Sequence, residues 1–331
     1  MRILAAPDKF RGTASAVEVA AAIGRSARAA GWDCDAVPMA DGGEGTLDAL
    51  GGPNRTTLVT GPLGDVVEAP WRLHRSVAVI EMARASGIDL VDGPEGNDPI
   101  AAATHGTGEL IAAAVDAGAR RVIVGVGGSA TTDGGLGALR ALYPPQRLRG
   151  IDLVVACDVR TSFVAAAEVF AGQKGASGAQ IELLRRRLER LVQVYFEDFG
   201  VDVAGLEGSG AAGGLAGGLA AIGAELVPGF DLVAEEVELY DRMEGADLIV
   251  TGEGFLDEQS FDGKVVGGVT RLAAEAKVPV LAVAGEVFDE VGGRITALSL
   301  VDSFGPERSR ADTVACIEEV VTAYLQTGPT A

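Results

Sequence analysis

The sequence predicts an α/β protein of two domains, one with a doubly wound parallel sheet and one with a mixed sheet. Short apolar strands alternate with amphipathic helices at both ends of the chain, which is typical of βαβ units. Between residues 56 and 82, three short strands follow one another without an intervening helix, which indicates antiparallel pairing. The length of 331 residues also exceeds that of most single domains.

Both ends of the chain are predicted to form the doubly wound domain, which would contain residues 1–50 and 245–331. Ser15 and Glu18 have the spacing of a capping box, so a helix is expected from there to Gly31. Further helices are expected from Lys264 to Ala276 and up to Leu325. The expected strands of this domain lie at residues 1–6, 34–39, 247–251, 278–284 and 295–301.

The middle of the chain, residues 51–244, is predicted to form the second, inserted domain. It contains the three antiparallel strands and two buried strands, and its long amphipathic helix is capped by Ser177. His105 opens another helix, and we interpret this histidine as a loop residue rather than a proton carrier. The expected strands of this domain lie at residues 56–59, 66–73, 77–82, 122–126 and 151–157.

The stretch from residue 121 to 137 is the strongest candidate for an anion site. A buried strand enters a loop of glycines and hydroxyls, and a helix-like segment leaves it, so backbone N–H groups converge there. An ordinary strand–turn–helix connection explains the stretch equally well. The candidate groups in it are Gly127, Gly128, Ser129, Thr131, Thr132 and Asp133, the last as a metal ligand or proton acceptor.

Several carboxylates follow predicted strands, where open α/β sheets bind their ligands. Asp8 and Asp41 follow two strands of one βαβ unit and are expected to face one cleft, although Asp41 is almost equally well explained as a helix cap. Asp158 follows the strand at 151–157 and is our candidate for a metal ligand or a base. Glu253 and Asp257 lie in a loop after the strand at 247–251.

The formal net charge of −20, from 27 basic and 47 acidic residues, makes each cation in a candidate loop informative. A small anionic substrate would need a local positive site on such a surface. Lys174, a flexible cation between glycines, is the preferred phosphate ligand. Arg84 follows a strand and is a candidate anion contact, although most such arginines only lie at surfaces.

Composition argues against several classes of function. The acidic balance disfavours binding to nucleic acid or anionic lipid, and no apolar run approaches the length of a membrane span. Two histidines leave little material for a histidine zinc site or a Ser-His-Asp triad. Three distant cysteines and the lack of a signal-peptide pattern predict reduced thiols in a cytoplasmic protein.

A dinucleotide-dependent oxidoreductase is a second hypothesis. Residues 125–130 match the pattern GxGxxA after a predicted strand, whereas residues 208–218 match GxGxxG without one. The glycines at 208–218 would nevertheless allow close approach to a ligand. The acidic residue expected about 20 positions after the fingerprint is missing, which opposes this hypothesis.

A series of short motifs runs in order along nearly the whole chain. The motifs are APD-x-F-x-G-x-x-SA (6–16), ADGGEGT (40–46), EMA-x-ASG (81–87), GTGEL (106–110), GGSAT-x-DGG (127–135), ACDV (156–159), QKGA (173–176), GAAGGL (210–215) and TGEG-x-LD-x-QS (251–260). This series resembles the type I glycerate kinases. The resemblance implies ATP-dependent phosphorylation of a hydroxyl of D-glycerate with Mg²⁺, leaving open which hydroxyl. It also implies a Rossmann-like domain plus a smaller α/β domain, with the site in the cleft between them.

From the residues and the resemblance together we assign roles as hypotheses. The expected partners are glycerate and ATP, without nucleic acid or membrane, and a homodimer is one option. The catalytic candidates are Asp158, Asp8 and Lys174, and the metal candidates are Asp158 and Asp133. The substrate-binding candidates are Arg11, Asp41, Glu44, Arg84 and Lys9. The candidates for binding ATP are Gly127, Gly128, Ser129, Thr131, Asp133, Glu253, Asp257 and Lys264.

The chain departs from the family pattern at several of these loops. The pattern usually has serine and lysine at the positions of Lys9 and Arg11, asparagine at Thr132 and arginine at Phe255. It also has Asn-Pro-Leu at residues 161–163, where this chain has Thr-Ser-Phe. These departures favour, as an alternative, a catalytically weak or acceptor-altered relative that binds a small anionic or nucleotide ligand.

Overall fold

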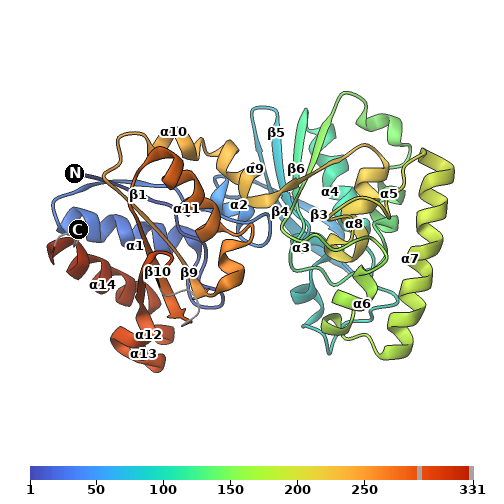
Figure 1. Cartoon of the computed structure of the whole chain (residues 1–331). Helices are drawn as coiled ribbons and strands as arrows, with labels where there is room; N and C mark the ends of the chain where they lie inside the picture. Colours follow the sequence, from blue (N-terminus) through green and yellow to red (C-terminus); the bar gives the residue numbers. More distant parts are fainter. Residues whose placement is uncertain (289–292, 328–331) are drawn as a thin grey trace. The chain divides into compact units, whose positions relative to one another are not determined.

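The computed structural model describes residues 1–288 and 293–327, which divide into two compact units. Unit 1 contains Met1–Asp41, Asp48–Leu50 and the described residues from Phe230 onward, and unit 2 contains Gly42–Leu47 and Gly51–Gly229 (Figure 1). Unit 1 is therefore built from both ends of the chain. Unit 2 holds more residues than unit 1, whereas the resemblance implied that the domain with the mixed sheet is the smaller one.

Unit 1 contains a parallel sheet of five strands in the order β11-β10-β9-β1-β2. Every neighbouring pair in it is parallel, which confirms the predicted doubly wound sheet. Counted along this unit the order is 2-1-3-4-5, so the direction of winding reverses between β1 and β9. The strands are β1 (Arg2–Ala5), β2 (Asp33–Ala36), β9 (Leu248–Leu256), β10 (Val280–Val287) and β11 (Thr296–Ser299).

Helices cover both faces of this sheet because successive strand side chains point to opposite sides. Ile3 and Ala5 pack with α1 (Ala16–Ala29) and α14 (Thr313–Thr327), which lie side by side on one face (Figure 1). Leu4 packs on the other face, in a core shared with helices α9, α10 and α11. The other helices of this unit are α9 (Gly229–Glu236), α10 (Leu239–Met243), η4 (Glu258–Phe261), α11 (Val265–Ala276), α12 (Leu300–Phe304) and α13 (Pro306–Ala311), and α2 (Thr46–Ala49) lies across the boundary of the units.

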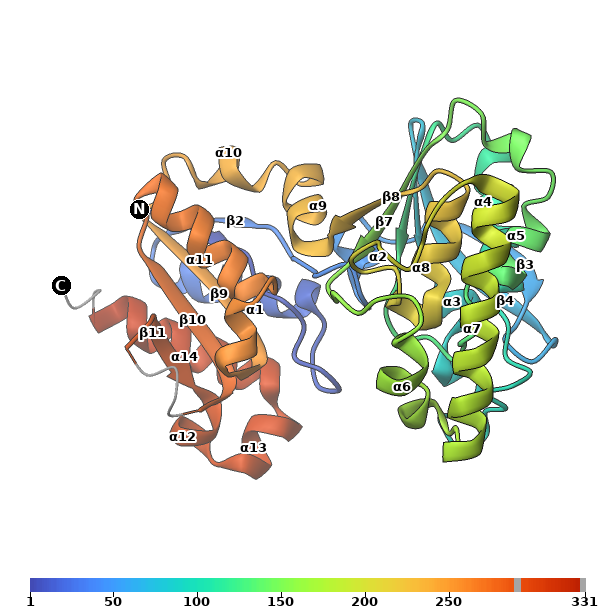
Figure 2. The same ribbon diagram turned by 45° about the vertical axis from the view of Figure 1, so that its right-hand side comes forward.

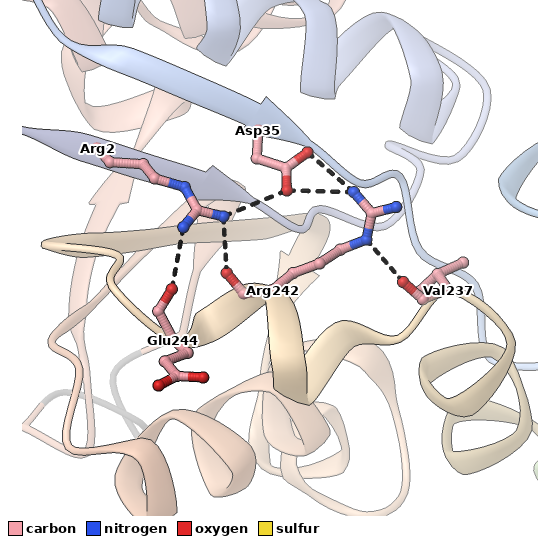
Figure 3. Close-up of polar contacts among 5 residues, drawn as sticks. All are labelled: Arg2, Asp35, Val237, Arg242 and Glu244. Atoms are coloured by element: carbon pink, nitrogen blue, oxygen red, sulfur yellow. Dashed lines mark hydrogen bonds and ion pairs between the residues drawn. The ribbon is translucent and has the colours of Figure 1, made fainter.

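Residues 230–244, which we had expected in the inserted domain, group with unit 1 in the structure. An ionic network explains this placement (Figure 3). Arg242 of α10 contacts both carboxylate oxygens of Asp35 on β2, at 3.1 and 3.2 Å, and donates to the carbonyl of Val237. Arg2 on β1 donates to the carbonyls of Arg242 and Glu244. These bonds tie α10 to the strands at the start of the chain.

Unit 2 contains a mixed sheet of six strands in sequence order, from β3 to β8. The first three strands are antiparallel and the remaining pairs are parallel, as the patterning predicts. The strand β8 was not predicted, because its residues ELVP show neither alternation nor a continuous apolar run. The strands are β3 (Arg55–Thr60), β4 (Val66–His74), β5 (Val77–Glu81), β6 (Arg121–Gly125), β7 (Asp152–Cys157) and β8 (Glu225–Pro228).

The helices of unit 2 pack around this sheet, and α7 is the longest of those described. Helices α6 and α7 lie side by side (Figure 2). Leu184 and Leu188 on the apolar face of α7 are buried with residues of α6, as the amphipathic pattern predicts. The hydroxyl of Tyr195, on the same face, donates to the carbonyl of Gly134 at 3.0 Å. The helices are α3 (Ala83–Ser86), η1 (Ile88–Val91), α4 (His105–Asp116), α5 (Leu136–Ala141), η2 (Pro145–Leu148), α6 (Ala166–Phe170), η3 (Gly172–Lys174), α7 (Gly178–Phe199) and α8 (Ala211–Ala221).

The glycine-rich stretch at 208–218 forms most of helix α8, which is buried along its whole length. A Cβ on Gly213 would lie 2.0 Å from the carbonyl oxygen of Thr131, and a Cβ on Gly218 would lie 2.5 Å from that of Gly134. A Cβ on Gly217 would lie 2.4 Å from the ring of Phe163. The sequence predicted that these glycines allow close approach to a ligand. In the structure they allow α8 to approach the loop after β6 and Phe163.

None of the helices in the described part of the chain combines the length and apolar composition needed to cross a bilayer. The cysteines Cys34, Cys157 and Cys316 are all free thiols, in agreement with the sequence prediction.

Replacing Gly217 by alanine should destabilise the protein, because the new methyl group would overlap the buried ring of Phe163. We expect the free energy of unfolding to fall by about 1–3 kcal/mol, the usual cost of overpacking a core. Gly178→Ala is the matched control, since no heavy atom lies within 4 Å of its Cβ position at the start of α7. Urea unfolding measures both variants, and equal midpoints for the two would contradict the packing described for α8.

Candidate functional site

Three loops of unit 2 pack together at the carboxyl ends of β5 and β6. The N–H of Val126 donates to the carbonyl of Gly42, and the N–H of Met82 donates to that of Gly125. The segment after α3 continues this contact, because Gly87 and Ser129 form an antiparallel bridge. Glycine is required here, since side chains would separate the backbones. The motifs at 40–46, 81–87 and 127–135, which are far apart in the sequence, are thus adjacent.

The loop after β6 presents backbone donors that have no acceptor in the described part of the chain. Within residues 1–288 and 293–327, no acceptor is found for the N–H groups of Gly127, Gly128 and Ser129. A Cβ on Gly127 would lie 2.8 Å from the Cα of Gly43, so only glycine fits at this position. Unpaired N–H groups that follow one another along a loop attract anions. These donors lie in the loop for which the sequence predicts an anion site.

Thr131 and Thr132, expected to add hydroxyl donors to this loop, are almost completely buried. Their Oγ1 atoms have no hydrogen-bond partner within the described ranges. The carbonyl oxygen of Thr131 lies against Gly213 of α8, so this part of the loop faces the interior of unit 2. The exposed edge of the loop is formed by Gly127 and Gly128.

The carboxylate of Asp133 accepts hydrogen bonds from the backbone of two segments of unit 2. Its Oδ2 accepts from the N–H groups of Thr104 and Gly137 and from the hydroxyl of Thr104, at 2.9 to 3.0 Å. Its Oδ1 accepts from the N–H of Gly135 at 3.1 Å. With both oxygens engaged, Asp133 caps the start of α5 and fits poorly as a metal ligand. Asp158, the other metal candidate, is exposed after β7.

A metal site made of protein side chains alone is not found in the described part of the chain. No group of three or more His, Cys, Asp or Glu side chains lies close enough together there to hold an ion. Magnesium usually binds one or two carboxylates together with phosphate oxygens and water. The donor set therefore fits magnesium only as an ion that arrives with a phosphate ligand.

Lys174 is buried, with 4% of its surface exposed, so the expectation of a flexible cation is wrong. Its Nζ donates to Oγ of Ser129 at 2.7 Å and to the carbonyl of Thr131 at 2.6 Å. Burial lowers the pKa of Lys174 to about 7, and the nearby charge of Asp133 opposes this shift. Lys174 therefore stabilises the loop after β6 from the buried side, through these two hydrogen bonds.

Glu81 is a buried residue of this region that sequence reasoning missed as a candidate. It ends β5 with 2% of its surface exposed. Its Oε1 accepts from the N–H groups of Gly45 and Leu47, at 2.8 and 2.9 Å, and thereby shapes the loop that contains Glu44. Its Oε2 accepts from Nε of Arg84 at 3.1 Å. The signal available in the sequence was an acidic residue at the end of an apolar strand.

In unit 1, Asp8 and Asp41, which follow β1 and β2, lie near Glu253. Glu253 lies within β9 and not in a loop after it, because this strand continues to Leu256. Burial raises the pKa of Asp8 from 3.8 to about 7, and the charges of Asp41 and, more weakly, Glu253 add to this shift. Burial also raises the pKa of Glu253 from 4.5 to about 7, against the opposing charge of Lys264. Two acidic groups that exchange protons near neutral pH thus lie close together. They lie by the neighbouring strands β1 and β9, between which the winding of the sheet reverses, and ligands usually bind at such a reversal.

The remaining candidates of unit 1 surround this cluster. Asp257 caps η4, since its Oδ1 accepts from the N–H of Ser260 at 3.1 Å, which was not its predicted role. Lys9 and Lys264 are half-buried, and Arg11 is exposed in the loop after β1. Phe255 shares a strand face with Glu253 and is 50% exposed.

Comparison with known proteins covers both units. A model of the glycerate kinase family matches residues 3–143 and 144–318. A glycerate 2-kinase from Escherichia coli (strain K12) is 39% identical over 332 residues, which cover 88% of this chain and 87% of that protein. A glycerate kinase from Halalkalibacterium halodurans is 38% identical over 325 residues, covering 86% of this chain and 85% of that protein.

A crystal structure shows the same similarity in three dimensions. It contains a protein assigned as glycerate kinase 2 from Salmonella typhimurium LT2, which is 34% identical to this chain. The TM-score is 0.84, and the alignment covers 99% of this chain and 98% of the other. The similarity in fold and in sequence therefore extends over the whole chain.

The raised pKa values predict how stability depends on pH. Between pH 4 and 7 the folded state should bind more protons at Asp8 and Glu253 than the unfolded state does. The free energy of unfolding should therefore fall as the pH rises through this range, because deprotonation leaves buried negative charges. Urea unfolding at several pH values measures this fall, which should be smaller in Asp8→Asn because asparagine does not ionise.

The exposed residue Asp198 provides the control for this measurement. Asp198→Asn should keep the pH dependence of the wild type. If Asp8→Asn and wild type show equal slopes between pH 5 and 7, Asp8 does not carry the raised pKa.

Proposed function

The chain belongs to the glycerate kinase family, and we propose that it transfers the terminal phosphoryl group of ATP to a hydroxyl of D-glycerate. The product would be phosphoglycerate. The single observation that best supports the proposal is the loop after β6, where the N–H groups of Gly127, Gly128 and Ser129 have no acceptor within the described residues. Phosphoryl transfer depends mainly on such positioned donors together with magnesium and a proton acceptor.

For the proton acceptor we propose Asp8. A general base works best when its pKa lies near the working pH, and burial has raised the pKa of Asp8 to about 7. An ordinary aspartate would be a much weaker base at neutral pH. In its deprotonated form the carboxylate of Asp8 would accept the proton of the glycerate hydroxyl. Glu253, with a similar pKa, would hold a second exchangeable proton beside it.

For the magnesium ion we propose Asp158 as the protein ligand. Its exposed position after β7 fits this role, whereas the oxygens of Asp133 already accept four hydrogen bonds. Magnesium bound with ATP would neutralise the charge that develops on the phosphates. Asp133 would instead keep the loop after β6 in shape by capping α5.

The cations of the candidate loops would balance the charges of the substrates. Lys9 and Arg11 lie in the loop after β1, and Lys264 begins α11. Arg84 has its guanidinium oriented by Glu81 and is half-exposed, so part of it can contact a carboxylate or phosphate. Asp41 and Glu44 would accept hydrogen bonds from glycerate hydroxyls. The cytoplasmic location and the option of a homodimer stay predictions.

The proposal predicts that ADP forms only when enzyme, ATP, magnesium and D-glycerate are all present. A coupled assay that follows ADP tests this directly, and incubation with NAD and glycerate should give no NADH. Omitting magnesium, for example by chelation, should abolish ADP release because the charge on the phosphates is then not neutralised. Saturating D-glycerate with no ADP above the rate without enzyme would refute the kinase proposal.

A second candidate function, an altered acceptor, is favoured by Phe255. The family pattern has arginine at this position, and arginine can bind a carboxylate through two hydrogen bonds. Phe255 offers none, and its half-exposed ring lies 6.5 Å from that of Phe288. Losing one such contact costs about 1.5–3 kcal/mol unless another cation replaces it. An acceptor with less negative charge than glycerate would suit this surface better.

The variant Phe255→Arg separates these two functions. If the acceptor is altered, the new guanidinium should raise kcat/KM for D-glycerate by roughly ten- to a hundredfold without changing the KM for ATP. Phe196→Arg adds the same charge at a 60% exposed position on α7 and is the matched control. If wild type already has an ordinary rate and Phe255→Arg only lowers it, the acceptor is D-glycerate itself.

A further inference from the structure

The hydroxyl of Ser129 has a proton for which the described residues offer no acceptor. Oγ of Ser129 accepts a hydrogen bond from Nζ of Lys174 at 2.7 Å. A hydroxyl has one proton, and when its oxygen accepts from an ammonium that proton points elsewhere. Among residues 1–288 and 293–327, the hydrogen bond from Lys174 is the only one found for this hydroxyl. Ser129 is 8% exposed and follows two glycines whose N–H groups are also without an acceptor there.

Lys174 is held in place from several sides. Its Nζ also donates to the carbonyl of Thr131 at 2.6 Å. Its own carbonyl accepts from Nδ2 of Asn97, which bonds the carbonyl of Ala130 as well. Gly175, the next residue, has a φ of +93°, and a Cβ there would lie 2.3 Å from the carbonyl oxygen of Pro94. Two of the three N–H groups of the ammonium are thus engaged within the protein, and the residue is only 4% exposed, which disfavours direct contact with a ligand.

We infer that Lys174 is a positioning residue that directs the O–H of Ser129 outward, toward an anionic oxygen of the substrate. The identity of this substrate rests on the proposed function. The O–H of Ser129 and the N–H groups of Gly127 and Gly128 then form one set of donors. In its protonated form, the buried Lys174 also polarises the hydroxyl, which makes Ser129 a stronger donor. The anionic oxygen belongs either to a phosphate of ATP or to the carboxylate of glycerate.

The experiment compares Ser129→Ala, Lys174→Met and the double variant with wild type. The dissociation constants for ATP and for D-glycerate are measured separately by titration calorimetry, and turnover is measured as ADP release. Ser129→Ala should weaken binding of one ligand by roughly tenfold or lower kcat/KM to a similar extent, as expected for one donor to a charged group. The ligand that is affected identifies which anionic oxygen Ser129 binds.

The double variant distinguishes positioning from direct contact. If Lys174 acts through Ser129, the double variant should lose no more than Lys174→Met alone, within about twofold. If Lys174 contacts the anion directly, the two losses should multiply, which would overturn the inference. Lys277→Met removes an exposed lysine and should change neither constant. Far-UV circular dichroism and the Tm identify any variant that does not fold.

If Lys174→Met does not fold, Ser129→Thr decides the question. Threonine keeps the hydroxyl, so Ser129→Thr should retain binding and turnover within a few-fold, while Ser129→Ala loses them. Equal values for Ser129→Ala and wild type would overturn the inference. Ligand binding by wild type without ADP release would refute the kinase proposal alone, since the binding comparison would still test Ser129. Absence of binding of both ligands to wild type would overturn both proposals.

Discussion

The pairing of β1 with β9 is the constraint on which the rest of unit 1 depends. These strands come from opposite ends of the chain, yet Ile3 lies opposite Leu248 in a parallel ladder. Beyond the strands, the hydroxyl of Thr251 donates to the carbonyl of Ala6, and the N–H of Asp8 donates to that of Gly252. Because the winding of the sheet reverses between these strands, their carboxyl ends leave room for a ligand. The same pairing places Asp8 near Glu253, and burial is the main cause of the raised pKa of each.

In unit 2 the corresponding constraint is the contact between glycine-rich backbones. The loop after β6 lies between helix α8 and the loop at 42–47, and a side chain at Gly127 or Gly213 would collide with backbone. Such contacts bury backbone polar groups, each of which needs a partner. Charged side chains supply several of these partners: Glu81 for residues 45 and 47, Asp133 for the start of α5, and Lys174 for the carbonyl of Thr131. Buried charges thus shape a loop whose outer edge keeps its own donors available.

The candidate site illustrates how far sequence reasoning reaches. It selected Lys174, Asp133 and Asp257 because they are charged residues in predicted loops, although in the structure Lys174 ends the short helix η3. It could not tell that two of them bond to backbone N–H groups and the third to a carbonyl and a hydroxyl within the protein. A charge in a sequence does not reveal its partners, because these come from distant segments. Glu81 was missed for the same reason, since its partners lie about 35 positions earlier in the chain.

The amino-acid sequence by itself determined the local elements and the class of fold. The alternation of apolar strands with amphipathic helices predicted the parallel sheet, and the three successive strands from 56 to 82 predicted the antiparallel part of the other sheet, because these periodicities follow from local geometry. Only the tertiary structure decided that β8 joins the sheet of unit 2 and that residues 230–244 pack in unit 1, where Arg242 meets Asp35. Burial, pairing with distant charges and the direction of a hydroxyl depend on segments that meet only after folding. For that reason Lys174, which the sequence predicted to be a flexible cation that binds phosphate, is a buried residue in the structure.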